Sequence, residues 1–378
     1  MRDLKYAGIC LCFLLASCGN PELLAGTQVD FWAFLTQTRI DGYVDATGNA
    51  ARFKKIVALA VDSQDRVYVA DTGNARIRMI TPQGQVSTVA GTDKIQSEFS
   101  AESLPLETQL VDLAGLTIHK DVLYFTVKGC VRSLDLNTPE DKRKLQTYYG
   151  KCLSSQEKEK SDDEYEGLNQ KPDQLRFLGQ IQHDKNGNLY VEAATTDTEG
   201  FLRNVPWLKD SLDREVVNKI DVQKKVSFQS SLTYNFVVDS TSCVVNLPDA
   251  NNFGDRYIAS DCRQQTSEGS FYGTNDKDDP RLKPRDLNAI WMGNDDDLFI
   301  FGTWLAKLSL QGKITFIAPL PNGIWNRSVL NPAETLVYTA DDTSVYRWPL
   351  FLSLPFKSTM RSEPKGLATK DFMRLCAS

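Results

Sequence analysis

Short runs of hydrophobic residues, separated by polar turn residues, recur along most of the chain. In the clearest stretch, residues 56–89, the runs are separated by Ser63-Gln64-Asp65, Asp71-Thr72-Gly73-Asn74 and Pro82-Gln83-Gly84. Asp, Asn, Gly and Pro favour tight turns, and apolar runs of this length between such turns are typical of β-strands. The spacing therefore predicts an antiparallel meander of short strands.

The same stretch contains Ala60-Val61-Asp62, Val67-Tyr68-Val69-Ala70-Asp71, Gly73-Asn74 and Arg76-Ile77-Arg78. Together these pieces resemble the NHL repeat, which is the blade unit of a family of β-propellers. The resemblance implies one propeller blade here, with the motif residues Asp62, Tyr68, Asp71, Gly73, Asn74 and Arg76.

A single blade cannot bury both of its faces, so one copy of the repeat predicts further copies. The apolar–aromatic pair Val67-Tyr68 has four counterparts downstream: Leu123-Tyr124, Leu189-Tyr190, Leu298-Phe299 and Val337-Tyr338. In the long gap between Leu189 and Leu298, Val244-Val245 takes the place of a further pair. Six units result. We therefore expect an all-β fold, a six-bladed NHL-type β-propeller over residues 29–352, with seven blades as the minor alternative. An open β-sandwich, or two all-β domains, is the other architecture compatible with the pattern.

Most units also have candidate third and fourth strands, at Val131–Leu134, Leu305–Leu308, Val345–Trp348, Leu145–Tyr148, Ser270–Tyr272 and Ile314–Ile317. The last unit ends near Trp348 without a clear fourth strand. A spare β-like run, Val29 to Leu35, precedes the first unit. We expect this run to complete the last blade, because closure of the ring removes exposed sheet edges.

The N-terminus has a different pattern. Arg2 and Lys5 precede an apolar run from Tyr6, which ends in Leu15-Ala16-Ser17-Cys18. A basic segment, a short apolar run and small residues before the cut are typical of a secretory signal. The last four residues resemble the lipobox of bacterial lipoproteins. The resemblance implies cleavage before Cys18 and acylation of Cys18 with diacylglycerol and a further chain such as palmitate. The alternative is a plain secreted protein with a chance cysteine.

This pattern divides the chain into a signal peptide (1–17), a lipidated tether (18–28), the propeller (29–352) and a C-terminal segment (353–378). We expect the protein in the bacterial cell envelope, with membrane lipid as a partner through Cys18. Gly19 is not the Asp that favours retention in the inner membrane, so we expect the outer membrane. No second apolar run reaches the roughly 20 residues that span a bilayer.

Composition and charge narrow the partners. The net charge is −6, and it becomes −7 when Arg2, Lys5 and Asp3 leave with the signal peptide. A mildly acidic chain has no electrostatic basis for binding nucleic acid. Charged segments at Thr138–Gln174, Thr195–Asp213 and Gly273–Pro284 are typical of solvated loops, apart from the predicted strand Leu145–Tyr148 in the first.

Five cysteines follow Cys18, in a compartment where disulfides are expected. In a meander blade the start of one strand lies beside the end of the next. Cys130 begins a predicted third strand and Cys152 follows the fourth, while Cys243 begins a second strand and Cys262 follows the third. We therefore predict the disulfides Cys130–Cys152 and Cys243–Cys262, and Cys376 is left over.

Candidate catalytic chemistry is sparse. The chain has two histidines, His119 and His183, which cannot supply a three-histidine zinc site. No nucleophile elbow or phosphate loop is present, so we assign no catalytic residue and no metal ligand. The sequence favours a binding scaffold for an unknown envelope protein, peptide or glycan. The alternative is a calcium-dependent hydrolase or lactonase, with axial ligands drawn from Asp71, Asn74, Asn188 and Asp295.

Overall fold

The computed structural model describes residues 22–27, 41–96, 99–154, 179–193, 216–231, 235–247, 259–260, 289–301, 304–309, 314–319 and 327–350. Several predicted features lie outside these residues: the signal peptide, Cys18, residues 29–35, the fourth strand at 270–272, Cys262, Cys376 and the C-terminal segment 353–378. Among the described residues, no helix is long and apolar enough to cross a membrane.

The described strands form six antiparallel sheets, which we number in chain order. Sheet 1 contains β2 (Ile56–Val61), β3 (Val67–Asp71), β4 (Arg76–Ile80) and β5 (Val86–Ala90). Sheet 2 contains β7 (Leu116–His119), β8 (Val122–Val127), β9 (Cys130–Asp135) and β10 (Leu145–Gly150), with β6 (Glu102–Ser103) beyond β10. Sheet 3 contains β11 (Ile181–His183), β12 (Leu189–Ala193), β13 (Val216–Ile220) and β14 (Val226–Ser231).

The remaining sheets follow the same order. Sheet 4 contains β15 (Asn235–Val238), β16 (Val244–Leu247) and β17 (Ala259–Ser260). Sheet 5 contains β18 (Ala289–Met292), β19 (Leu298–Phe301), β20 (Trp304–Leu308) and β21 (Ile314–Pro319). Sheet 6 contains β22 (Arg327–Leu330), β23 (Leu336–Ala340), β24 (Ser344–Pro349) and β1 (Glu22–Gly26). Four 3-10 turns accompany them: η2 (Gly48–Ala50), η3 (Thr72–Asn74), η4 (Pro105–Glu107) and η5 (Glu140–Lys142).

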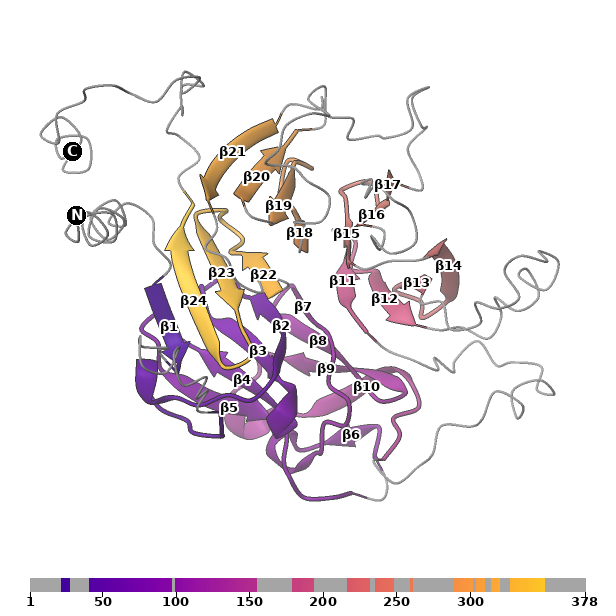
Figure 1. Ribbon diagram of the computed structural model, residues 1–378. Helices are drawn as coiled ribbons and strands as arrows, with labels where there is room; N and C mark the ends of the chain where they lie inside the picture. The colour runs from indigo at the N-terminus through magenta and orange to yellow at the C-terminus, as the bar shows by residue number, and fades with distance from the viewer. Residues whose placement is uncertain are drawn as a thin grey trace, which may run out of the picture.

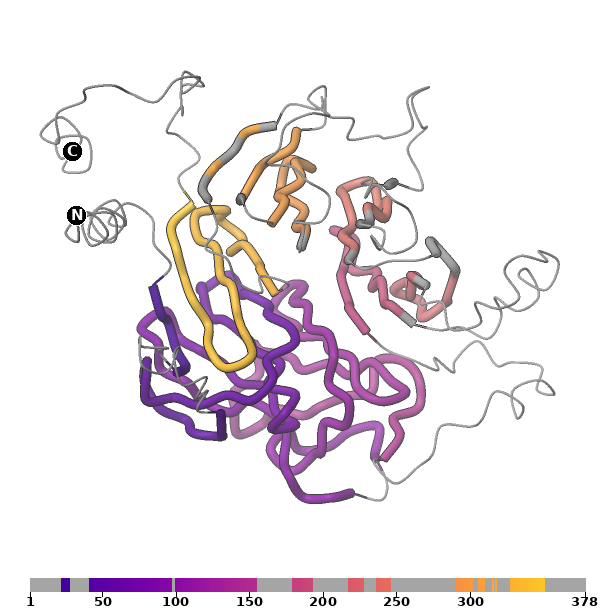
Figure 2. Tube along the Cα trace, viewed as in Figure 1, coloured from indigo at the N-terminus to yellow at the C-terminus, as the bar shows by residue number. Residues whose placement is uncertain are grey.

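The six sheets are arranged in a ring around a central axis (Figure 1). The first strand of each sheet contacts the first strands of its two neighbours, in the cyclic order β2, β7, β11, β15, β18, β22 and back to β2. Figure 2 shows the chain running once around this ring, so that the last sheet lies beside the first. The fold is an all-β propeller, as the sequence predicts.

The apolar–aromatic pairs identify the second strand of every sheet. Val67-Tyr68 lies in β3, and the five counterparts lie in β8, β12, β16, β19 and β23. The second strand is buried on both faces, which is why its pattern is a continuous apolar run rather than an alternation. The described third and fourth strands also confirm the prediction, in β9, β10, β20, β21 and β24.

The prediction of the closing strand is wrong in its position. An N-terminal strand does complete sheet 6, but that strand is β1, which pairs antiparallel with β24 from Glu22↔Arg347 to Gly26↔Ser344. The indigo β1 lies beside the yellow β24 in Figure 1. β1 therefore occupies the position expected for residues 29–35, and it lies within the segment 18–28 that the sequence assigns to a tether.

A short repeated sequence marks the end of β1. Ala25-Gly26-Thr27 repeats Ala90-Gly91-Thr92, which ends the fourth strand of sheet 1. Gly26 has φ of 113°, and a Cβ there would lie 2.4 Å from the Thr343 carbonyl oxygen. Gly91 has φ of 106°, and its Cβ would lie 2.3 Å from the Ala75 carbonyl oxygen. Both positions need glycine because the fourth strand leaves the sheet against the backbone of the third.

One substitution tests the position of the closing strand. Gly26→Ala adds both a positive-φ penalty and a backbone clash, so we expect the free energy of unfolding to fall by roughly 2 kcal/mol or more. The matched control is Gly48→Ala, which has φ of 57° but no atom within 4 Å of the added Cβ; it should cost about 1 kcal/mol. Equal losses in denaturant titrations of the two variants would contradict the pairing of β1 with β24.

Candidate functional site

The turn between the first and second strands has the same construction in several sheets. Asp62 Oδ1 accepts hydrogen bonds from the backbone N–H groups of Gln64 and Arg66, both at 2.9 Å. Asp184 and Asp239 accept the equivalent pairs of hydrogen bonds in sheets 3 and 4. In each case the carboxylate satisfies amides that the tight turn would leave without a partner. The motif residue Asp62 is therefore a turn former.

Hydrogen bonds link these turns, or the strand ends beside them, around the whole ring. Each link joins one sheet to the next, and together they form a closed circle: Ser63 to Asp121, Thr117 to His183, Ser242 to Asp184, Ser240 to Asp296, Asn294 to Glu334 and Asn331 to Asp65. The Asn331 Nδ2 to Asp65 Oδ1 bond, at 2.9 Å, joins the last sheet to the first. This end of the propeller is therefore held by polar contacts above the apolar interfaces.

Of the other motif residues, Tyr68 is buried and donates to Asp62, while Asp71, Gly73, Asn74 and Arg76 stabilise the opposite end of sheet 1. Asp71 Oδ2 accepts hydrogen bonds from Arg78 at 3.0 Å and from Asn74 at 2.8 Å. Burial raises the pKa of Asp71, while these hydrogen bonds and the charge of Arg78 oppose the rise. A Cβ at Gly73 would lie 2.5 Å from the Lys54 carbonyl oxygen, so this close approach needs glycine. The guanidinium of Arg76 lies over the ring of Tyr43, at 4.1 Å from its centroid.

Sheet 2 has no carboxylate at the position of Asp71, and it carries a disulfide at the same end. By strand register, Cys130 and Val127 take the positions that Arg76 and Asp71 hold in sheet 1. Cys130 is bonded to Cys152, as predicted from the strand order. Cys243 is also disulfide-bonded, and its predicted partner, Cys262, lies outside the described residues.

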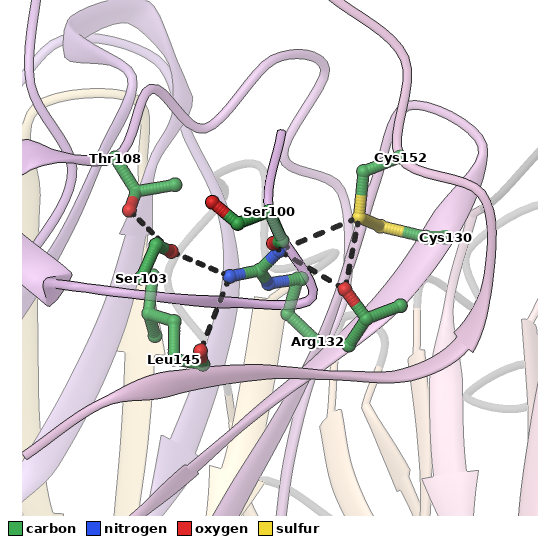
Figure 3. The surroundings of a disulfide bond; sticks show 8 residues. Ser100, Ser103, Thr108, Cys130, Arg132, Leu145 and Cys152 are labelled. Carbon is green, nitrogen blue, oxygen red and sulfur yellow. Dashed lines mark hydrogen bonds between the residues drawn. A yellow bond between two sulfur atoms is a disulfide. The ribbon is translucent and has the colours of Figure 1, made fainter. Parts of the chain in front are cut away.

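Figure 3 shows that the disulfide lies beside Arg132, the counterpart of Arg78. Arg132 is buried, and no carboxylate lies within ion-pair distance of it among the described residues. Instead it donates to neutral acceptors, including the Ser100 carbonyl oxygen at 2.9 Å and Ser103 Oγ at 2.7 Å. Burial lowers the pKa of Arg132 to about 10. The sulfur of Cys152 is 3.7 Å from an Arg132 nitrogen.

A pocket of about 320 Å³ lies on the axis, at the end where the hydrogen bonds between neighbouring sheets form a closed circle. Its walls come from the first strands of all six sheets, and most of them are apolar: Leu59, Val61, Leu116, Val237, Trp291 and Leu330. Polar side chains lie at the strand ends and in the turns of four sheets: His119, Lys120, His183, Asn294, Asn331 and Glu334. The pocket thus combines mostly apolar strand walls with polar side chains at the strand ends and in the turns, as is typical of small-molecule sites.

The structure brings the two histidines together at this pocket. The ring centroids of His119 and His183 are 4.8 Å apart, and Thr117 Oγ1 is 2.7 Å from His183 Nδ1. Burial lowers the pKa of His183 to about 4, with His119 adding to the effect and Asp184 opposing it. Burial and the charge of Lys120 also lower the pKa of His119. Both imidazoles are therefore neutral at pH 7.

The four candidate calcium ligands do not converge. Asp71 and Asn74 bind each other in sheet 1, while Asn188 binds Asp184 in sheet 3. Asp295 lies in the turn of sheet 5, and none of the four lines the pocket. Within the described ranges, no group of three or more His, Cys, Asp or Glu side chains is placed to hold a metal ion.

Comparison with known proteins supports the repeat and the fold. Residues 53–78 match the model of the NHL repeat. A putative gluconolactonase shares 11% identity at a TM-score of 0.50, over 89% of this chain and 93% of that one. A gluconolactonase from Xanthomonas campestris shares 11% identity at a TM-score of 0.49, over 88% of this chain and 96% of that one. A Bacteroides thetaiotaomicron protein of unknown function shares 13% identity at a TM-score of 0.49, over 88% of this chain and 76% of that one. No curated protein matches the chain.

The histidine pair predicts a pH dependence of stability. Between pH 4 and 6.5 the unfolded chain protonates His183 but the folded protein does not, so stability falls as the pH drops through this window. The slope from this one group is at most about 1.4 kcal/mol per pH unit. We expect thermal melts of a His183→Gln variant to lose this part of the acid destabilisation. Parallel pH profiles for the variant and the wild type would contradict the assignment.

Proposed function

We propose that this protein is a lipid-anchored, extracytoplasmic, six-bladed NHL-type propeller that binds a ligand or partner at its axial pocket. The observation that carries the proposal is the pocket itself. It combines apolar walls with a polar mouth, and its mouth is framed by exposed turns such as the one at Asn294. Envelope proteins, peptides and glycans present both apolar and polar groups, which this combination suits.

The anchoring part of the proposal rests on the segment Leu15-Ala16-Ser17-Cys18. A diacylglycerol and a further acyl chain on Cys18 provide durable attachment, whereas a single chain binds only marginally. Because β1 begins at Glu22, only a few residues separate the lipid from the ring. We therefore propose that the propeller is held close to the membrane surface, in the outer membrane of the bacterial envelope.

The alternative is a calcium-dependent hydrolase with an axial metal. Calcium takes six to eight oxygen ligands. Among the described residues, Glu334 is the one carboxylate that lines the axial pocket. The likeness to gluconolactonases is a likeness of fold at 11% identity, and fold alone does not assign chemistry. We therefore favour binding over catalysis.

Anchoring is tested by the fate of Cys18. We expect metabolic labelling with palmitate to mark the full-length protein in a bacterial host, and expect Cys18→Ser to remove the label and leave an unprocessed precursor. Cys10→Ser is the matched control, since Cys10 lies within the apolar run of the signal peptide, and it should label normally. Equal labelling of the Cys18 and Cys10 variants would refute the lipoprotein assignment.

Binding at the mouth is tested by site-specific photo-crosslinking in intact cells. A crosslinking residue at Asn294, exposed beside the pocket, should give discrete adducts. The same residue at Asn137, exposed at the β9–β10 connection, should give none. Adducts from both positions, or from neither, would contradict a binding site at the axial pocket.

A further inference from the structure

The six turns at the end of the propeller that carries the axial pocket are strongly acidic. They comprise residues 62–66, 120–121, 184–188, 239–243, 293–297 and 331–335. Together they contain nine Asp or Glu residues against three Lys or Arg residues, a net charge of −6. Lys219 and Lys307, on adjacent strands, pair with Asp184 and Asp297 and offset two of these charges, so this end of the propeller stays net negative.

Glu334 places one of these charges in the pocket wall. Its Oε1 accepts a hydrogen bond from the backbone N–H of Asn294, which fixes the carboxylate beside the mouth. Within the described residues, no Lys or Arg lies within ion-pair distance of Glu334, whereas Asp297 in the neighbouring turn is paired with Lys307 at 2.7 Å. Glu334 therefore has acceptor capacity for a further cationic group.

The rest of the lining fits the same ligand. Trp291 and Met292 are partly exposed in the pocket, next to the apolar walls from Leu330 and Val237. The face of a tryptophan ring attracts an organic cation, and the apolar walls bind a hydrocarbon part. Lys120 is the single Lys or Arg among the described residues of the lining, and Asp121 follows it in the chain.

We propose that the axial pocket binds a monovalent organic cation that carries an apolar group. Its amine or guanidinium contacts Glu334 beneath the acidic turns, and its apolar part lies against Trp291 and the strand walls. A small lipophilic amine and a Lys or Arg side chain next to an apolar residue in a peptide share this chemistry. The inference deepens the proposed function and rests on it, since it names the ligand class of the same pocket.

The test compares three probes of the same size and shape: 4-phenylbutylamine, 4-phenylbutanol and 4-phenylbutyrate. Calorimetry and tryptophan fluorescence are measured on the full chain in phosphatidylcholine nanodiscs, with empty nanodiscs as the blank. We expect the amine to bind about tenfold more tightly than the alcohol and the carboxylate to bind most weakly. Raising the salt from 50 to 500 mM should weaken binding of the amine and leave binding of the alcohol unchanged.

Variants locate the site. Glu334→Gln keeps the acceptor for Asn294 but removes the charge, so we expect amine affinity to fall five- to tenfold and alcohol affinity to change less than twofold. The matched control is Glu107→Gln, exposed in η4, which should change neither affinity. Trp291→Phe should remove the fluorescence change. A dipeptide amide, Leu-Lys-NH₂ with an acetylated N-terminus, that binds more tightly than the amine would identify a peptide as the source of the cation.

Each outcome decides the inference. If the amine and the alcohol bind equally, or if Glu107→Gln weakens the amine as much as Glu334→Gln does, the pocket does not select cations. Because the alcohol still binds in those cases, the proposed binding function survives while the ligand class is wrong. If no probe binds, the inference fails, and the photo-crosslinking from Asn294 decides separately whether the proposed function fails with it.

Discussion

Mutual burial of neighbouring sheet faces is the constraint on which the whole molecule depends. Among the described residues, the apolar core is divided into six clusters, and each cluster lies between two adjacent sheets. A sheet whose neighbour is missing exposes an entire apolar face to water. The cluster between sheets 6 and 1 includes Leu24 and Ala25 of β1, so the N-terminal strand contributes to the core as well as to the sheet. The ring is therefore stable only as a closed unit.

The polar end of the propeller follows from the same geometry. Each first strand must turn sharply near the axis, and an Asp or Asn side chain satisfies the turn amides in most sheets. Because the six turns lie side by side, their side chains also bind one another across the sheet boundaries. The residues that make the turns thus give an acidic character to the end of the propeller where the axial pocket lies. If the pocket binds the cation that we propose, the same side chains serve both folding and ligand selection.

Much of the ring was predictable from sequence because second strands such as β3, with Val67-Tyr68, are buried on both faces and stand out as apolar runs. The position of the closing strand was not predicted correctly, because the run Val29 to Leu35 is more apolar and aromatic than Glu22–Gly26. The decisive signal was a repeated Ala-Gly-Thr, which reports backbone conformation rather than hydrophobicity. The pocket was also not predictable from sequence. Its residues Thr117 and His183 are 66 residues apart, and they come together only because sheets 2 and 3 are neighbours in the ring.

The pairing of β1 with β24 sets an order of events during folding. Glu22 and Arg347 are 325 residues apart, and each is held by the other in the closed ring. β1 is the first described strand of the chain, and it is thus synthesised long before its partner strand. Five sheets, and β22 to β24 of sheet 6, can form from local hairpins, but the pairing of β1 waits for an encounter between the two ends of the propeller. Closing so long a loop carries an entropic cost that grows slowly with its length, and contacts of this separation slow folding. If Cys18 is acylated, this encounter occurs with one end already at the membrane surface.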